Sequence, residues 1–366
     1  MLTEGDEYPI HQRPEPVAFC GSDRNFYDRY FFNGYSPDGA VFFAGALGVY
    51  PHLNIMDGAI SVLHEGRQTS VFVSRALNME RMDTRVGPLS VEVIKPLRQV
   101  RLRLEAAEGV SLDAAFTGRH FPLEEPRFTH RQGPRMLIDC TRMTQNGHWT
   151  GALSVDGASF TIDDWPGTRD RSWGVRPIGA RDPQPLVPAQ LPQFFWLWAP
   201  INFPGHALYF HVNEDARGSA WNTRCVVAED GAGAGALHAL NRPKMDVTWS
   251  QNTRRIGAAT LHAEDGLGAA QKIEYTPIST FQMKGLGYGH PELGHGVWQG
   301  EGVVVTRQDD QPASLPWQMP ENLHIQALVE AVHTGPDGAE HRGIGVLEQL
   351  CIGPHAPSGW SDVLDA

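Results

Sequence analysis

The chain has few cysteines for its length, and none lies close to another in the sequence. Four occur in 366 residues, at Cys20, Cys140, Cys225 and Cys351. No Cys-x-x-Cys pair is present, so zinc-knuckle and thioredoxin-type motifs are excluded. Widely spaced cysteines in a long chain are typical of reduced, mostly buried thiols rather than of a disulfide framework.

Positive charge is also scarce. Lys and Arg together number 30 against 42 Asp and Glu, which gives a formal net charge of −12. This balance argues against nucleic acid or an anionic membrane surface as the main partner. No apolar run approaches the ~20 residues that a membrane-spanning helix needs, and the acidic, polar start of the chain is unlike a signal peptide. We expect a cytoplasmic protein with no membrane span, and a homodimer is compatible with the sequence.

Motifs of several common chemistries are missing too. There is no phosphate loop, no Gly-x-Gly-x-x-Gly in a βαβ context and no Gly-x-Ser-x-Gly elbow, so nucleotide-dependent and serine-hydrolase activities are disfavoured. His290, Glu292 and His295 form the one loop set that resembles a two-histidine, one-carboxylate metal site. We favour ligand binding or simple exposure for these histidines, and we predict neither a metal nor an organic cofactor.

Turns are what the chain has in abundance, with 39 Gly and 27 Pro. Short β-type segments recur about every 10 residues, between turn signals such as Ser36-Pro37-Asp38-Gly39 and Asp156-Gly157. Residues 99–104 alternate polar and apolar side chains, as expected for a half-buried antiparallel strand. No amphipathic helix longer than two turns is evident. The pattern predicts an all-β protein built as two antiparallel β-barrels.

A proline-rich segment separates the two halves. Five prolines fall within residues 177–192, and little regular structure survives that spacing. We therefore predict an N-terminal barrel domain at 1–176, a linker at 177–192 and a C-terminal barrel domain at 193–366. A barrel of about eight strands can hold one small ligand, and the aromatic content can line such a pocket.

The most unusual stretch is Asp163 to Pro177, which is dense in Trp, Arg and Asp. At its centre Asp170 lies between Arg169 and Arg171, and Trp173 follows. One interpretation is a structural corner that ties Asp to Arg. The other is a site in which Asp170 acts as acid or base and the π-face of Trp173 stabilises a developing cation. The arginines would lower the pKa of Asp170 unless they point away from it, as alternate residues of a strand do.

Other candidates would bind a ligand. Trp196 and Trp198 offer further aromatic faces, although their segment is also typical of a strand buried on both sides. Hydrogen bonds and a polar end-group site are predicted from Arg176, Tyr209, His211, Asn222, Tyr288, His290 and His295.

Part of the chain resembles a known family. The resemblance rests on the run from Gly147 to Gly151, on Val155-Asp156-Gly157, on residues 169–176 and on the loop from Gly287 to Gly296. These segments resemble the AttH-like, lipocalin-like group that includes the carotenoid 1,2-hydratases, also called hydroxyneurosporene synthases. Their hallmark is an Asp, two residues and then Trp-Gly, matched here by Asp170, Trp173 and Gly174. The residue after the Asp is commonly His in the hydratases and is Arg171 in this chain.

The resemblance implies two tandem lipocalin-like (calycin-type) barrels, an apolar polyene, terpenoid or steroid-like ligand, and no organic cofactor. Three functions follow from the sequence as a whole. The first is a cofactor-independent hydratase, isomerase or cyclase that acts at the barrel junction. The second is a carrier that binds a hydrophobic small molecule without changing it. The third is an interaction or structural protein with two filled barrels.

Overall fold

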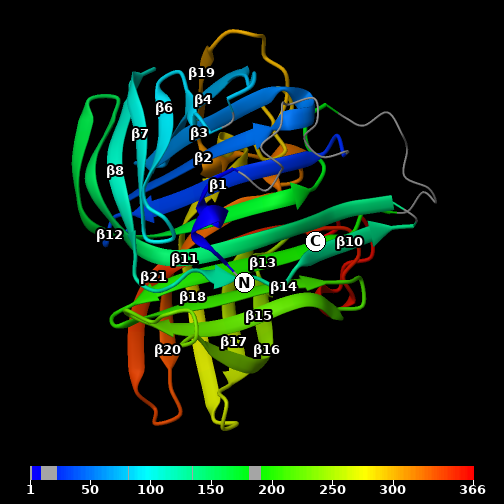
Figure 1. Ribbon diagram of the computed structural model, residues 1–366. Coiled ribbons are helices and arrows are strands. Elements are labelled where there is room, and N and C mark those ends of the chain that lie inside the picture. The colour runs from blue at the N-terminus through cyan, green and yellow to red at the C-terminus, as the bar shows by residue number, and fades with distance from the viewer. Residues whose placement is uncertain (1, 10–22, 81, 134, 181–190) are drawn as a thin grey trace. The chain divides into compact units, whose positions relative to one another are not determined.

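The computed structural model describes residues 2–9, 23–80, 82–133, 135–180 and 191–366, and it divides the chain into two compact units. Unit 1 contains residues 1–189 and 284–311, and unit 2 contains residues 190–283 and 312–366. Both units are built from antiparallel strands (Figure 1). No α-helix occurs in the described residues, where all helical turns are of the 3-10 type. The predicted all-β class is confirmed.

Unit 1 is one 13-stranded sheet. Its strands are β1 (Phe26–Tyr35), β2 (Val41–Tyr50), β3 (Ile55–His64), β4 (Arg67–Ala76), β5 (Arg85–Val86), β6 (Leu89–Lys95), β7 (Gln99–Ala107), β8 (Val110–Gly118), β9 (Leu123–Glu124), β10 (Phe128–Gln132), β11 (Arg135–Val155), β12 (Ala158–Val175) and β19 (Val304–Asp310). The main path runs β19-β4-β3-β2-β1-β12-β11-β8-β7-β6-β5, and β9 and β10 pair with β11.

The sheet of unit 1 is curled but does not close as the predicted first barrel would. Its path ends at β19 on one side and at β5 on the other, and β5 is only two residues long. A short terminal strand is one way in which proteins protect an open sheet edge. The inner face carries the main apolar cluster, which includes Phe32, Phe43 and Trp149.

Most of the unusual stretch from Asp163 to Pro177 belongs to a strand. Strand β12 runs from Ala158 to Val175 and pairs with β1 and β11. The usual alternation is hidden because the inner-facing positions at the end of β12 include Arg169 and Arg171, which are fully buried as ion pairs. Buried charges of this kind do not follow the apolar pattern from which strands are recognised.

Unit 2 is a closed eight-stranded barrel, and this prediction is confirmed. Its strands are β13 (Phe194–Phe203), β14 (His206–Glu214), β15 (Ala220–Glu229), β16 (His238–Trp249), β17 (Ile256–Glu264), β18 (Ala270–Gln282), β20 (Ile325–Thr334) and β21 (Glu340–Ile352). Short 3-10 turns in the chain are η1 (Glu4–Glu7), η3 (Pro51–Leu53), η4 (Met283–Leu286), η5 (Pro312–Ser314), η6 (Pro320–Asn322) and η7 (Ala356–Ser358). Inward-facing residues such as Leu197, Phe210 and Tyr275 form its core.

The unit boundaries differ from the predicted domains in one respect. Residues 284–311 belong to unit 1, although they lie between two parts of unit 2 in the sequence. Strand β19 in this segment pairs with β4 along its whole length. This pairing joins residues more than 200 positions apart, which local sequence patterns do not reveal. Of the predicted linker, residues 181–190 lie outside the described part of the chain.

Cys140, Cys225 and Cys351 are buried free thiols, as the cysteine spacing predicted, and Cys20 lies outside the described residues. Burial raises the pKa of the Cys351 thiol to about 12, so this side chain stays a neutral thiol at physiological pH. None of the helical segments in the described residues has the length and apolar character that a membrane crossing requires.

Candidate functional site

Both arginines beside Asp170 have structural roles in unit 1. The guanidinium of Arg169 pairs with Glu7, and both side chains are fully buried. Arg171 pairs with Asp28 at 2.7 Å, and its guanidinium carbon lies 4.0 Å from the ring centroid of Tyr30. The Arg169–Glu7 pair attaches the N-terminal turn η1 to the inner face of the sheet. Arg169 and Arg171 therefore each have a carboxylate partner other than Asp170.

Asp170 and Trp173 lie on opposite faces of β12. The register with β1 is continuous here, with Asp170 opposite Phe31 and Trp173 opposite Asp28. Since side chains of a strand alternate between faces, residues three apart point in opposite directions. Trp173 packs beside Leu97 and Met143 on the inner side. The structure thus does not place the two predicted catalytic side chains in one site.

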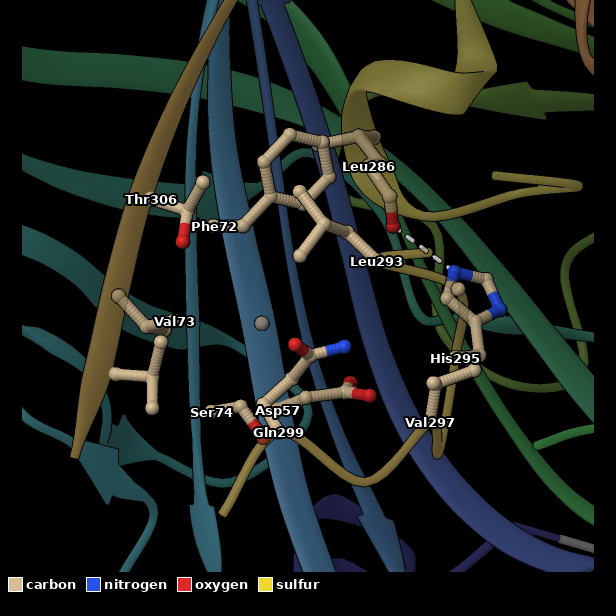
Figure 2. Close-up of a pocket in the computed structure, with 13 residues that line it drawn as sticks. Asp57, Phe72, Val73, Ser74, Leu286, Leu293, His295, Val297, Gln299 and Thr306 are labelled. Atoms are coloured by element: carbon tan, nitrogen blue, oxygen red, sulfur yellow. Dashed lines mark hydrogen bonds between the residues drawn. The ribbon is translucent and has the colours of Figure 1, made fainter. Parts of the chain in front are cut away.

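Three of the predicted ligand-binding residues do come together in unit 1. Nη2 of Arg176 donates to Nδ1 of His295 at 3.1 Å, and the rings of Tyr288 and His295 are in edge contact, with centroids 4.4 Å apart. Nε2 of His295 donates to the carbonyl oxygen of Leu286 at 2.9 Å (Figure 2). Because a guanidinium can only donate, His295 is fixed as the neutral tautomer that carries its proton on Nε2.

A carboxyl group that the sequence analysis did not single out lies next to this cluster. Oδ1 of Asp57 accepts a hydrogen bond from the Tyr50 hydroxyl at 3.0 Å, and Oδ2 accepts one from the backbone N–H of Gly296 at 2.7 Å. Nη1 of Arg29 donates to the Tyr50 hydroxyl at 3.3 Å, and Nη2 donates to the carbonyl oxygen of Leu286 at 3.0 Å. The cluster thus joins strands β1, β2 and β3 to the loop after η4.

The pKa of Asp57 is raised to about 6. Burial is the largest cause, because it penalises the charged carboxylate, and the Arg29 and Arg176 guanidiniums together with the hydrogen bonds from Gly296 and Tyr50 offset part of that effect. A carboxyl with this pKa is present in both protonation states near neutral pH. It can therefore donate or accept a proton at a useful rate.

A small cavity lies directly beside Asp57 (Figure 2). Asp57, Gln299 and Ser74 lie at one end of it, and apolar side chains that include Phe72 and Leu293 lie at the other. Its volume is about 20 Å³, which is room for about one water molecule. The arrangement places a carboxyl with a raised pKa beside a water-sized space with apolar surroundings.

The predicted His290 lies elsewhere in the same loop. Its Nε2 is 2.6 Å from Oε1 of Gln308, and its Nδ1 accepts from the backbone N–H groups of Glu292 and Leu293. Both ring nitrogens of His295 are already engaged. Among the described residues, no group of three or more His, Cys, Asp or Glu is placed to hold a metal ion.

The remaining predicted residues form a separate network in unit 2. Trp196 and Trp198 alternate with the core residue Leu197 on β13, so they lie on the outer face of the barrel. The Tyr209 hydroxyl is 2.8 Å from Nδ1 of His211.

Two further contacts extend this network. Nε2 of His211 is 3.0 Å from Oδ1 of Asn222. Nε1 of Trp196 donates to Oε1 of Glu348 at 2.9 Å, and His324 and Gln326 also contact that carboxylate. The pKa of Glu348 is lowered because these contacts outweigh burial, so Glu348 stays charged and is a poor proton donor.

The signal for Asp57 was present in the sequence but not recognised. Between Val41 and Leu63 it is the only Asp, Glu, Lys or Arg. A single carboxylate within an otherwise apolar strand pair indicates a desolvated acid. The sequence alone could not show that Tyr50 and Gly296 complete its surroundings.

Comparisons with known proteins place the chain in a family. Residues 2–361 match a family of unknown function, DUF8625, and the chain belongs to it. A search of the curated proteins found no match.

Solved structures show the relationship of the fold. One similar structure is a protein from Nitrosomonas europaea that is provisionally assigned as AttH, with a TM-score of 0.51 and 14% identity, covering 94% of this chain and 98% of that one. Another is kievitone hydratase from Nectria haematococca, with a TM-score of 0.53 and 11% identity, covering 88% of each chain. The AttH-like, lipocalin-like fold that the sequence resemblance implied is confirmed.

Proposed function

We propose that the chain is a cofactor-independent enzyme of the hydratase or isomerase type that acts on an apolar small molecule, with Asp57 as the proton donor or acceptor. The observation that carries this proposal is the position of Asp57, whose pKa is raised to about 6, beside a water-sized cavity with a largely apolar lining. Addition of water to a carbon–carbon double bond needs an acid for the carbon and a water molecule held nearby. Double-bond isomerisation needs the acid and base roles without the water.

The groups hydrogen-bonded around Asp57 would stabilise its charged form. Tyr50 donates to Asp57 and accepts from Arg29, so a proton lost from Asp57 leaves a carboxylate that is already hydrogen-bonded. This preorganisation lowers the cost of forming the charge. The substrate cannot occupy a cavity that holds one water, so its entry requires movement of the glycine-rich loop between residues 287 and 302.

The fold likeness to kievitone hydratase supports a hydratase in particular, and the sequence resemblance to carotenoid hydratases points in the same direction. We do not propose Asp170 and Trp173 as a catalytic pair, because they lie on opposite faces of β12. A carrier function remains the alternative, and it would require neither a proton nor an ordered water.

The test uses isotopic labelling, because the substrate is not identified. Protein is incubated with an apolar extract of the producing cells in H₂¹⁸O and, separately, in D₂O. A hydratase gives a product heavier by one labelled water, and an isomerase incorporates deuterium without adding water.

Asp57→Asn should reduce product formation by about 10²-fold or more, whereas Asp139→Asn, at a half-buried carboxylate that pairs with Arg127, should not. Unchanged turnover by Asp57→Asn, or no labelled product with the wild-type protein, would overturn the proposal.

A further inference from the structure

The cluster around Asp57 contains more positive than negative charge. Arg29 and Arg176 both lower the pKa of Asp57, but neither lies within ion-pair distance of a carboxylate in the described residues. The buried Arg169 and Arg171 each have such a partner. Asp57 is moreover half-protonated near pH 6. Buried or half-buried guanidiniums without a counter-charge are costly, so this excess calls for an explanation.

The two arginines have unused hydrogen-bonding capacity. Arg29 is only 2% exposed, and its Nε has no hydrogen-bond partner within the part of the chain that the structure describes. Arg176 is half-buried and uses Nη2 for its bond to His295. Its guanidinium carbon lies 4.3 Å from the ring centroid of Tyr27 and 5.5 Å from that of Tyr288. These rings hold the guanidinium plane in place, and its remaining N–H donors make no side-chain hydrogen bond to another described residue.

We infer that this cluster binds the carboxylate of an apolar organic acid, with Arg176 as the group that contacts it and Arg29 as a second positive charge behind it. The planar fork of an arginine matches the two oxygens of a carboxylate. The apolar side chains beside Asp57 would contact the hydrocarbon part of the same molecule. The inference rests on the proposed function in taking this cluster as the substrate site, and it adds that the substrate is an acid.

The experiment measures binding rather than turnover. Isothermal titration calorimetry at pH 7.5 compares decanoate with decan-1-ol, which has the same chain length and no charge, and with inorganic phosphate and acetate as anions without a chain. We expect decanoate to bind at least tenfold more tightly than the other three. Equal binding of decanol, tight binding of phosphate or acetate alone, or no binding of decanoate would each overturn the inference.

Variants locate the site. Arg176→Gln should weaken decanoate binding at least tenfold and leave decanol unchanged, and Arg176→Lys should restore part of the loss because it keeps the charge but not the fork. Arg242→Gln is the matched control, since Arg242 is 81% exposed. An unchanged affinity for decanoate in Arg176→Gln would contradict the inference.

A second measurement separates a binding role from a merely structural one. A bound carboxylate offsets the arginine charges, so saturation with decanoate should raise the pKa of Asp57 above its value in the free protein, and decanol should not. Asp57→Asn should bind decanoate at least as tightly as the wild type, because it removes a negative charge. If Asp57→Asn keeps full turnover while Arg176→Gln loses decanoate, the proposed function fails and the acid-binding site stands.

Discussion

At the scale of the residue, burial acts on Asp57 and His333 by one mechanism. In both, a low-polarity environment favours the neutral form. It raises the pKa of Asp57 to about 6 and, together with the nearby His206 and His341, lowers the pKa of His333 to about 4. The two effects have opposite consequences for stability as the pH changes.

The prediction for His333 concerns unit 2. Its folded pKa of about 4 lies below the unfolded value of about 6.5, so the unfolded state takes up the proton first. The stability contributed by neutral His333 is complete above pH 6.5 and is lost as the pH falls toward 4. The wild type should lose about 1–2 kcal/mol more between pH 7 and pH 5 than His333→Gln does.

Urea unfolding at the two pH values measures this difference, and His262→Gln, at a residue that is 52% exposed, serves as the control. All of these proteins contain Asp57. Comparing the pH dependence of their unfolding free energies therefore removes the contribution of Asp57. An equal pH dependence in His333→Gln and the wild type would show that the histidine cluster does not titrate as described.

At this scale, the sequence indicated some of the residues that make up the candidate site. Arg176, Tyr288 and His295 were recognised by residue type and by their glycine-rich or aromatic surroundings, and they do lie together. Asp57 was missed because burial raises its pKa, and that burial involves a loop whose Gly296 N–H, 239 positions away in the sequence, contacts the carboxyl group. No local pattern contains that contact.

At the scale of the element, the glycine of the hallmark motif has a structural reason. Gly174 has φ = +136°, and a Cβ there would meet the carbonyl oxygen of Asp139 and lie 2.7 Å from Cα of Cys140. The glycine thus lets β12 and β11 approach closely near their ends. Of the three residues in this motif, the structure explains Gly174 through strand pairing.

Gly174→Ala should therefore destabilise unit 1 by about 2–4 kcal/mol, combining backbone strain with a backbone clash. Gly157→Ala is a matched comparison, because φ is +88° there but no atom lies within 4 Å of the added Cβ. We expect it to cost only about 1 kcal/mol. Thermal or urea denaturation gives both values, and equal losses would contradict the role assigned to close strand approach.

Strands with alternating or wholly apolar sequences were predictable, and the hairpin turns at Gly39 and Gly157 have the positive φ that their sequences indicated. The extent of β12 was not predictable, because its inner face carries Arg169 and Arg171. These residues are compatible with a strand interior only because Glu7 and Asp28 neutralise them.

At the scale of the whole molecule, the two units share one chain in an interleaved order. Residues 284–311 leave the barrel after β18 and return before β20, and β18 and β20 are direct neighbours in the barrel. The segment is thus an insertion into unit 2 that completes unit 1. The sequence indicated two halves of similar size, but it did not indicate that residues 284–311 belong to unit 1.

Replacing residues 284–311 by a short Gly-Ser connection tests this division. The barrel of unit 2 should keep its protected amides, since every barrel strand retains both neighbours, whereas β4 should lose protection because β19 is gone. Hydrogen exchange followed by mass spectrometry reports both. Loss of protection throughout the barrel strands would mean that the segment is essential to unit 2 as well.

The central claim is that the fold creates a carboxyl group able to transfer a proton near neutral pH. The most direct measurement is the ¹³C titration of the Asp57 side-chain carboxyl by NMR in the intact protein, assigned by comparison with Asp57→Asn. We predict a midpoint at about pH 6. A midpoint near 4, the ordinary value for an aspartate, would contradict the assignment of Asp57 as the acid.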